Sequence, residues 1–444
     1  MKFRYNGLRA GLLVAALALV LGAGRPLQAA GGEPRIDPAT PACPDAGPSP
    51  SLACDKQILL SIRDTLADDR PEQFPTWQPD APLTDFTGVE VGGDPRRVIR
   101  LRVDAVWDAD EPALGGVVPP ALSRLPWLQE LSIVGRPEAP EHQLGGIIPP
   151  ELGQLSRLRE LVLRNHRLTG PIPPELSQLR NLQDLDLMNN QLTGPIPTEL
   201  GQLGQLRELY LHGNSLTGSI PPELGQPRNL RDLDLSHNQL AGPIPTELGQ
   251  LRNLRSLVLM NNQLTGPIPT ELGQLRNLRA LALMNNQLTG PIPTELGQLR
   301  NLRALALMNN QLTGPIPTEL GQLRNLWALA LSYNQLAGPI PPELQHLTNL
   351  WVLLDLSHNR LTGPIPPELQ HLANLWALDL SHNQLAGPIP PELQHLTNLR
   401  ALDLSHNRLT GPVPTELGQL ALLAVLHLDG NALTGPIPPE LQHL

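Results

Sequence analysis

Leucines recur along this chain at a fixed spacing, with polar residues between them. From Met260 to Leu331 the segment MNNQLTGPIPTELGQLRNLRALAL occurs twice unchanged, and a third copy differs only by Trp327 in place of Arg. In the LxL step, as in Leu281 to Leu283, a period of two predicts a short strand whose leucines point inward. Repetition at a period of 24 residues predicts a solenoid built by duplication, in which each unit packs on its neighbours.

The remainder of each unit predicts an extended segment and one helical turn. The GPIP step excludes helix, because Pro291 and Pro293 lack amide donors and bias the preceding residues to extended geometry. In the ELGQL step that follows, Leu296 and Leu299 are spaced to face the core from a short turn. A strand, an extended segment and a 3-10 or helical turn per unit predict an α/β solenoid, coiled as a right-handed horseshoe.

Asparagines keep the same period and provide an independent check. They recur every 24 residues, except for a step of 25 between Asn334 and Asn359, at Asn190, Asn214, Asn238, Asn262, Asn286, Asn310, Asn334, Asn359, Asn383, Asn407 and Asn431. A buried Asn carries two donors and an acceptor, so it satisfies backbone groups of its own and an adjacent coil. We therefore interpret this series as structural.

The combined motif LxxLxLxxNxLTGPIP resembles the plant-type leucine-rich repeat of receptor-like kinase ectodomains and polygalacturonase-inhibiting proteins. The resemblance covers roughly Val98 to Leu444. It implies a parallel sheet on the concave face, a second short sheet at the LTGPIP segment and helical turns on the convex side. Counting the LxL steps from Leu101 to Leu426 divides residues 98–444 into fourteen repeats and part of a fifteenth.

The first 53 residues predict export. Residues 1–30 have the features of a signal peptide: basic residues precede an apolar run from Gly11 to Ala23, and small residues follow it. The run is too short to span a bilayer comfortably, where about 20 residues are needed, so no membrane span is expected after cleavage; the alternative is a retained membrane anchor. Residues 31–53 are Pro-rich and predict a linker, and the expected location is secreted or at the cell surface.

Two cysteines, Cys43 and Cys54, are the only ones in the chain. In an exported protein we expect them to form a disulfide, the alternative being two free thiols.

Residues 54–97 predict an N-terminal cap. An amphipathic helix is expected from Asp55 to Ala67, with Asp55 as its cap. The stretch resembles the cap of polygalacturonase-inhibiting proteins, but Phe86 replaces a Trp of that family, and Thr84 and Val91 stand where it has further cysteines. Apolar packing is therefore expected to hold this cap together.

Three irregularities interrupt the repeats. Insertions at Val106 to Ala113 and Arg136 to His142 are expected to form loops on the rim, as recognition sites or as spacers. An extra residue near Trp351 to Leu354 predicts a bulge or a local adjustment of register. Because no C-terminal cap motif follows the last leucines, we expect either further chain or a covering partner at that end.

Composition narrows the choice of partner. The 50 prolines and 38 glycines recur in register with the leucines, so they mark turns rather than disorder. Net charge is −10, and Lys occurs only at Lys2 and Lys56, which argues against nucleic acid and anionic membranes as partners.

The candidate binding residues form columns on the predicted coils. Ahead of the strand leucines, a column of arginines gives way to Trp327, Trp351 and Trp376, the residue types that dominate binding hot spots. The alternative is that these indoles shield the strand edge. Aromatic candidates elsewhere are Tyr210 and Tyr333. Outward-facing acids suited to a basic partner, or forming a solvated acidic face, are Asp186, Asp234, Asp355, Asp379 and Asp403.

Catalysis, cofactors and metals are not expected. Asp379, Ser381 and His382 contain the residue types of a hydrolase triad, but residues alternating along one strand do not converge. The column of His358, His382 and His406 has metal-binding residues, yet no partners that would orient them are recognisable.

Three functional hypotheses remain, none of them an enzyme. The first is an exported recognition protein that binds an extracellular protein, peptide or glycan on its concave face. The second is an inhibitor of a secreted cell-wall hydrolase, which rests on the resemblance of the cap. The third is a structural surface adhesin or spacer. Near-identical central repeats argue against the second, because a tuned inhibitor surface should vary from coil to coil.

Overall fold

The computed structural model describes residues 51–67, 74–93, 96–104, 114–138 and 143–441. Their contacts define two compact units, an N-terminal unit ending at Leu240 and a C-terminal unit beginning at Ala241. The predicted signal peptide, nearly all of the linker, the first insertion and much of the second lie outside the described residues. Cys43 lies outside them too, so its pairing with Cys54 stays a prediction. Among the helices that are described, none is long and apolar enough to cross a bilayer.

Helix α2 (Leu52–Leu66) opens the N-terminal unit and begins earlier than predicted. The Ser51 side chain caps it by accepting a hydrogen bond from the Cys54 amide at 3.3 Å. Asp55 is therefore not the cap. Its buried carboxylate instead accepts from the Arg97 guanidinium at 2.8 Å and from the Val98 amide at 3.0 Å, so it fastens the helix to the first strand of the repeats.

Aromatic packing replaces the missing cysteines of the cap. Phe86 stacks on Trp77 with ring centroids 5.5 Å apart, and Phe74 lies 5.0 Å from Trp77 on another side. The Trp77 indole donates to the Thr87 carbonyl at 2.9 Å. All three rings are buried, as expected from the substitution of Phe86 for Trp.

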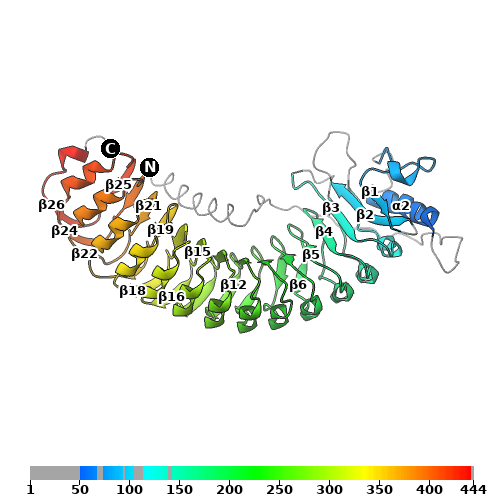
Figure 1. The fold of residues 1–444 in the computed structure, drawn as a ribbon, viewed down its shortest axis with the longest axis horizontal. Coiled ribbons are helices and arrows are strands. Elements are labelled where there is room, and N and C mark those ends of the chain that lie inside the picture. The colour runs from blue at the N-terminus through cyan, green and yellow to red at the C-terminus, as the bar shows by residue number, and fades with distance from the viewer. Residues whose placement is uncertain (1–50, 68–73, 94–95, 105–113, 139–142, 442–444) are drawn as a thin grey trace. The chain divides into compact units, whose positions relative to one another are not determined.

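A parallel sheet forms one face of the N-terminal unit (Figure 1). It starts with an antiparallel pair, β1 (Val89–Gly92) and β2 (Arg97–Asp104). From β2 onward the strands are parallel: β3 (Glu130–Val134), β4 (Glu160–Arg164), β5 (Asp184–Asp186), β7 (Glu208–Tyr210) and β9 (Asp232–Asp234). A second, two-stranded sheet pairs β6 (Thr193–Pro195) with β8 (Ser215–Thr217). The 3-10 turns of this unit are η2 (Leu83–Asp85), η3 (Pro120–Arg124), η5 (Pro150–Gln154), η6 (Pro174–Gln178), η7 (Thr198–Gln202) and η8 (Pro222–Gly225).

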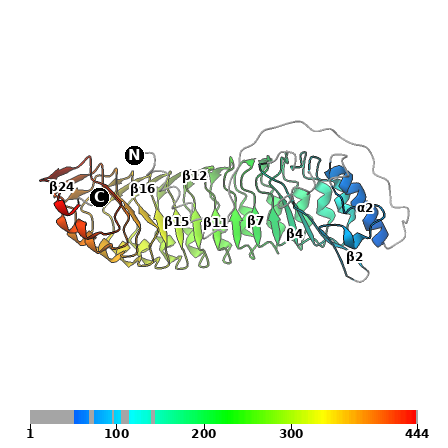
Figure 2. The ribbon, with the colours of Figure 1, turned by 90° about the horizontal axis from the view of Figure 1, so that it is seen from above.

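The C-terminal unit repeats the same coil (Figure 2), and the strands of its main sheet keep the length of β5, β7 and β9. Its main sheet is β11 (Ser256–Val258), β13 (Ala280–Ala282), β15 (Ala304–Ala306), β17 (Ala328–Ala330), β19 (Leu353–Asp355), β21 (Ala377–Asp379), β23 (Ala401–Asp403) and β25 (Val425–His427). The LTGPIP segments pair as the predicted second sheet: β10 (Ala241–Pro243), β12 (Gln263–Pro267), β14 (Gln287–Pro291), β16 (Gln311–Gly314), β18 (Gln335–Gly338) and β20 (Arg360–Leu361), then β22 (Ala386–Gly387), β24 (Arg408–Pro412) and β26 (Ala432–Thr434).

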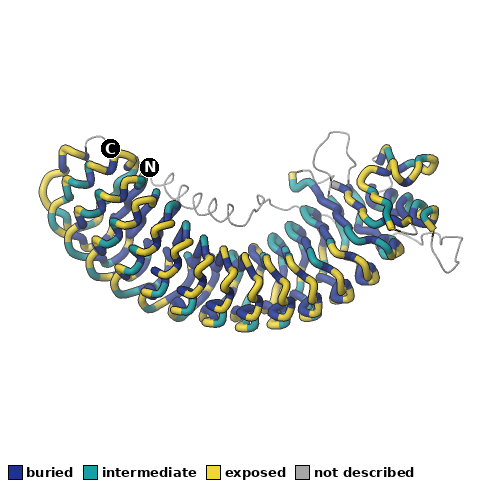
Figure 3. Tube along the Cα trace, viewed as in Figure 1, coloured by how far each residue is buried: buried dark blue, intermediate teal, exposed yellow. Residues whose placement is uncertain are grey.

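Every coil of this unit returns through a 3-10 turn on the side away from the main sheet. The turns are η9 (Thr246–Gln250), η10 (Thr270–Gln274), η11 (Thr294–Gln298), η12 (Thr318–Gln322), η13 (Pro342–His346), η14 (Pro367–His371), η15 (Pro391–His395), η16 (Thr415–Gln419) and η17 (Pro439–Leu441). A proline precedes η9 to η16 at the N-cap in extended geometry, because its fixed φ suits the entry to a helical turn. Buried residues run inside the coils, and exposed ones mark the turns (Figure 3).

The asparagine ladder links each coil to the preceding one. In one rung the Asn286 amide nitrogen donates to the carbonyls of Leu259 at 3.0 Å and Leu283 at 3.1 Å, while its oxygen accepts from the Leu264 amide at 3.0 Å. The same pattern recurs at Asn310. The side-chain amide thus uses both its donor and its acceptor groups inside the coils, so the ladder has the structural role predicted for it.

The extra residue of the repeats is absorbed before a strand rather than within it. The register of β17 against β19 is regular, with Leu329 opposite Leu354. Upstream, both the Trp351 and Val352 amides bond the Trp327 carbonyl, at 3.3 and 3.0 Å. The predicted irregularity is thus a local adjustment at the strand entry, and the pairing of the two strands contains no bulge.

Candidate functional site

A groove lined by three tryptophans and three asparagines lies at the amino-terminal ends of strands in the C-terminal unit. Trp327 and Trp376 directly precede β17 and β21, and Trp351 lies two residues before β19. We call this the tryptophan groove, a cavity of about 340 Å³ lined by Trp327, Asn349, Trp351, Asn374, Trp376 and Asn398. The indoles therefore line the edge at which the strands begin, where Trp327 and Trp351 pack against outward residues of the strands such as Ala328.

The indole rings are half-buried and tilted against one another. Trp327 and Trp351 have centroids 6.4 Å apart at 55°, and Trp351 and Trp376 lie 4.8 Å apart at 80°. The Arg303 guanidinium carbon lies 4.9 Å from the Trp327 ring centroid, and that of Arg400 lies 5.2 Å from Trp376. Such cation–π contacts are stabilising, so an arginine flanks the groove at each end.

The asparagines of the groove belong to a second ladder that sequence reasoning missed. Each donates one amide hydrogen to a carbonyl of the preceding coil: Asn349 to Arg324 at 2.8 Å, Asn374 to Thr348 at 3.1 Å and Asn398 to Ala373 at 2.9 Å. This use of one donor holds each amide in place. The signal was visible in the recurrence of Asn before the first leucine of most LxxLxL steps.

The outward strand acids lie at the opposite ends of the strands from the tryptophans. Asp355, Asp379 and Asp403 are the last residues of β19, β21 and β23. In each, one carboxylate oxygen accepts from the amide and the hydroxyl of the Ser two residues on, as in Asp379 to Ser381 at 3.0 and 2.7 Å. This arrangement is an Asx-type turn that ends the strand, so these carboxylates have a local structural use.

Beyond those acids, four rings stack face to face along neighbouring coils. The centroid distances are 4.0 Å for Tyr333 to His358, 4.1 Å for His358 to His382 and 4.3 Å for His382 to His406, with interplanar angles of 12 to 17°. Each of these residues has a positive φ between 51 and 54°. Parallel rings direct their nitrogen lone pairs along parallel lines, and no group of three metal-ligating side chains occurs in the described part of the chain.

The other predicted residues belong to the N-terminal unit. Tyr210 lies between Asp186 and Asp234 in the register of β5, β7 and β9. Its hydroxyl donates to Glu208 at 3.2 Å. Beside them, burial, followed by the charges of Glu208 and its acidic neighbours, raises the pKa of Asp184 to about 7. Burial likewise raises the pKa of Asp186 and Glu160. Asp184 is therefore partly protonated near neutral pH, but it lies in a different unit from the tryptophan groove.

A buried histidine in the N-terminal unit takes the place of a ladder asparagine. His166 stands one period before Asn190. Its Nδ1 accepts from the Leu144 amide at 3.1 Å, and its Nε2 lies 3.1 Å from the Ile133 carbonyl, which matches the bonds of Asn190 to Leu168 and Leu163. Burial lowers the pKa of His166 to about 4, so the ring is neutral with its hydrogen on Nε2. The period of the asparagines could have revealed this rung.

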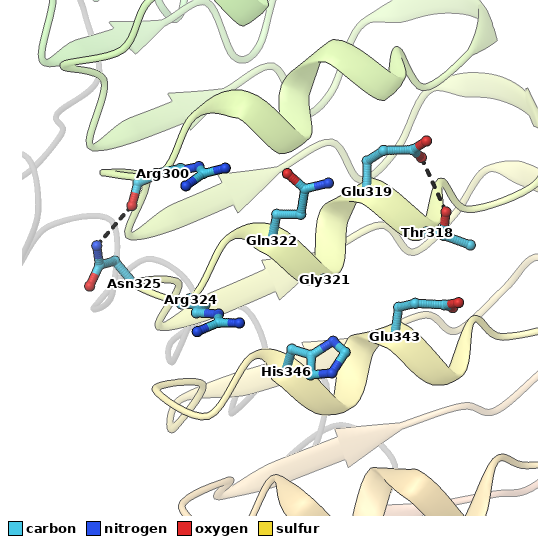
Figure 4. Close-up of a pocket in the computed structure, with 9 residues that line it drawn as sticks. All are labelled: Arg300, Thr318, Glu319, Gly321, Gln322, Arg324, Asn325, Glu343 and His346. Carbon is cyan, nitrogen blue, oxygen red and sulfur yellow. Dashed lines mark hydrogen bonds between the residues drawn. The ribbon is translucent and has the colours of Figure 1, made fainter.

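A second cavity, of about 700 Å³, lies on the side of the 3-10 turns (Figure 4). Its lining, drawn there, includes Arg300, Gln322, Arg324, Glu343 and His346. It lies where the turn sequence changes from TELGQ in η12 to PELQH in η13. Basic and acidic side chains both line it, and no tryptophan or tyrosine does, so the tryptophan groove is the better candidate for recognition.

Comparison with known protein families identifies the repeats. A model described as leucine-rich repeat region matches residues 113–266, a leucine-rich repeat model matches 276–336, and a single-repeat model matches 352–372, 374–396, 398–420 and 422–444. The curated proteins contain no match.

Several solved structures are similar. The plant peptide hormone receptor RGFR1, solved in complex with RGF2, is 38% identical over 72% of this chain and 54% of its own, with a TM-score of 0.64. A TDR receptor is 30% identical over 72% and 64%, with a TM-score of 0.60. A leucine-rich repeat protein of Leptospira interrogans is 36% identical over 72% and 88%, with a TM-score of 0.52. The chain thus spans little more than half of the first receptor and under two thirds of the second.

Proposed function

Because this chain belongs to the leucine-rich repeat proteins, we propose that it is an exported recognition scaffold that holds an extracellular protein, peptide or glycan in its tryptophan groove. The observation that carries the proposal is the groove itself, in which Trp327, Trp351 and Trp376 line one cavity. Trp is the residue type most enriched at binding hot spots, since a rigid indole buries a large area at low entropic cost.

Two further features support recognition rather than shielding alone. The indoles remain half-buried, so part of each stays accessible to a ligand. The groove asparagines carry polar groups that can fix the orientation of a ligand. The similarity to RGFR1, a receptor solved with RGF2, supports a peptide among the ligand classes, although this chain spans only part of that receptor.

The test is capture of extracellular ligands by the purified chain. Secreted proteins, a defined peptide pool and cell-wall oligosaccharides are each passed over the immobilised parent, over a W327A/W351A/W376A variant and over Trp127→Ala. Trp127 is a suitable control because it is also half-buried and has its own arginine contact, with Arg157 at 3.7 Å. We expect a ligand retained by the parent and the control, and bound at least about thirtyfold more weakly by the triple variant, as for a hot spot worth 2 kcal/mol or more.

Other outcomes would favour the competing hypotheses. Inhibition of a purified pectinase that survives in the triple variant would support the hydrolase-inhibitor hypothesis and reject the groove. Equal retention by all three proteins would also reject the groove. The absence of any retained ligand would favour a structural spacer.

A further inference from the structure

The cavity on the side of the 3-10 turns lies where a regular contact between coils is interrupted. In several earlier coils the arginine that follows a turn donates to the glutamine that ends the next turn. Arg276 donates to the Gln298 carbonyl at 3.2 Å and to its side-chain oxygen at 2.6 Å, and Arg180 donates to Gln202 in the same way. The guanidinium groups of these coils are therefore occupied by the protein itself.

This contact is missing at the two arginines that line the cavity, Arg300 and Arg324. The turn after Arg324 ends in His346, where the earlier turns have glutamine. Across the described residues, neither guanidinium makes a hydrogen bond or an ion pair. Each guanidinium carries five N–H donors, so one end of the cavity has a pair of positive charges with unused donors on neighbouring coils.

Two carboxylates form the other end of the cavity, across Gln322 and His346 from the arginines (Figure 4). Glu319 and Glu343 are the second residues of η12 and η13, so they too lie on neighbouring coils. In the described structure the Oε2 atom of Glu343 is buried without a hydrogen-bond partner, and no ion pair joins either glutamate to the arginines. Opposite charges thus line one cavity without neutralising each other.

Two like-charged pairs at opposite ends suit a ligand that carries both charges. A carboxylate accepts from guanidinium groups at one end, and an ammonium donates to carboxylates at the other. An anion alone leaves the buried Glu343 oxygen without a donor, and a cation alone leaves the arginines unused. The charges of the lining therefore favour a zwitterion over either single ion.

The size of the cavity and the separation of its ends favour a short peptide. Its volume of about 700 Å³ is in the range of small-ligand sites. Glu319 and Arg324 lie five residues apart along η12 and its exit, which is about 10 Å at the 3-10 rise of about 2.0 Å per residue. An extended chain advances about 3.3–3.6 Å per residue, so a peptide of about three residues spans the two ends.

We propose that this cavity is a second binding site, separate from the tryptophan groove, for a short linear peptide with free termini. The terminal carboxylate binds Arg300 and Arg324, and the terminal ammonium donates to Glu319 and Glu343. The Gln322 amide bonds the peptide groups between them. Because both termini are needed, the site selects short released peptides over internal segments of a longer chain.

The probe is tri-alanine with free termini, titrated into the full chain by calorimetry. Matched peptides are acetylated at the amino end or amidated at the carboxyl end, and inorganic phosphate tests whether the arginines accept any oxyanion. We expect tri-alanine to bind at least about tenfold more tightly than either blocked peptide, because each blocked peptide loses the hydrogen bonds of one charged end.

Paired variants assign each terminus to its end of the cavity. R300A/R324A should weaken tri-alanine at least about tenfold and change the weak binding of the amidated peptide little, because that peptide has no carboxylate to lose. The matched control is R252A/R276A, which removes two arginines of the same column that already bond glutamines. It should leave the binding of tri-alanine unchanged.

E319Q/E343Q should show the converse pattern, with weaker tri-alanine and little change for the acetylated peptide. Equal binding of tri-alanine and its acetylated form would overturn the proposal, as would phosphate binding as tightly as tri-alanine. No binding at about 10 mM tri-alanine, enough to nearly saturate a millimolar site, would overturn it too. The W327A/W351A/W376A variant should bind tri-alanine like the parent, so failure here is distinguishable from failure of the proposed function.

Discussion

The most specific physical prediction concerns His166, the rung that replaces an asparagine. Its ring bonds require the neutral form, because Nδ1 must accept from the Leu144 amide. Protonation would set an N–H against that amide and place a charge in a buried site. We therefore expect acid to weaken this rung, and we expect His166→Asn to restore the ordinary ladder and remove the weakness.

The magnitude follows from the pKa. The folded-state pKa of His166 is about 4, against an ordinary value of 6.5. Above pH 6.5 the ring is neutral in both states, so its contribution to stability is fully present. As the pH falls from 6.5 towards 4, the unfolded chain takes up a proton that the folded one refuses, and stability declines by about 1.4 kcal/mol per pH unit. The total loss is on the order of 3 kcal/mol.

A second group in the same unit acts in the opposite direction. The pKa of Asp184 is raised from 3.8 to about 7, so its penalty is absent below pH 3.8 and grows as the pH rises towards 7. Between pH 4 and 6.5 the two effects offset each other in the parent chain. Asp184→Asn removes the carboxyl and leaves the histidine dependence visible.

The assay is hydrogen exchange at the Leu144 amide, which reports on the rung directly. In the Asp184→Asn background we expect its protection factor, corrected for the intrinsic rate, to fall roughly tenfold per pH unit from pH 6.5 to 4. Adding His166→Asn should remove that fall. The Leu264 amide, which bonds Asn286 instead of a histidine, is the internal control. An equal fall at Leu144 with and without His166 would refute the reasoning.

The remaining predictions concern the two ladders, the cap and the strand acids. Asn286→Ala should lower the free energy of unfolding in urea by several kcal/mol, because it leaves buried backbone groups of two coils without partners. Asn301→Ala removes one exposed hydrogen bond and should cost about 1 kcal/mol or less. Similar costs for the two variants would contradict this account. Arg97→Met alone should destabilise by about 3–5 kcal/mol by leaving the Asp55 carboxylate buried without its partner. Adding Asp55→Leu should recover part of the loss in thermal melts, although the Val98 amide then loses its acceptor; no recovery would argue against the ion pair as the cause. Asp379→Asn keeps an oxygen for the Ser turn, so calorimetry should find ligand binding at the tryptophan groove within twofold of the parent, and a larger loss would return that acid to the binding site.

Much of the fold was predictable because the residues of the repeat restrict the backbone locally. The LxL step, the two prolines and the ladder asparagine each restrict the backbone locally, and from Leu233 onward they recur together. The helical turns followed from the same unit, whereas the second sheet at LTGPIP was implied by the resemblance to the plant-type repeats. By contrast the start of helix α2 was misplaced, because Asp55 is an equally good cap from its sequence alone, and only the partner Arg97 decides its role.

The sequence predicted which residues are candidates for binding, but it did not predict that the tryptophans and the aspartates lie at opposite ends of the strands. Trp327 and Asp355 both point away from the leucine core, and a period-two strand does not reveal that one stands at the entry and the other at the exit of three-residue strands. His166 was missed for a different reason, since an imidazole imitates the bonds of an amide only in a position whose geometry is already known.

Because the coils around β13 and β15 are identical in sequence, the sequence alone does not specify which of them pairs with which. Any coil in this stretch finds the same leucines and prolines in its next-but-one neighbour as in its neighbour, so a mispairing by one whole period keeps every contact and leaves only a loop of 24 residues unpaired. Loop closure penalises that error weakly. Trp327 and the extra residue before β19 therefore act as a landmark that fixes the count. Because the identical coils are interchangeable, whole coils can be added or deleted among them. The length of this solenoid can therefore change without any change to its buried contacts.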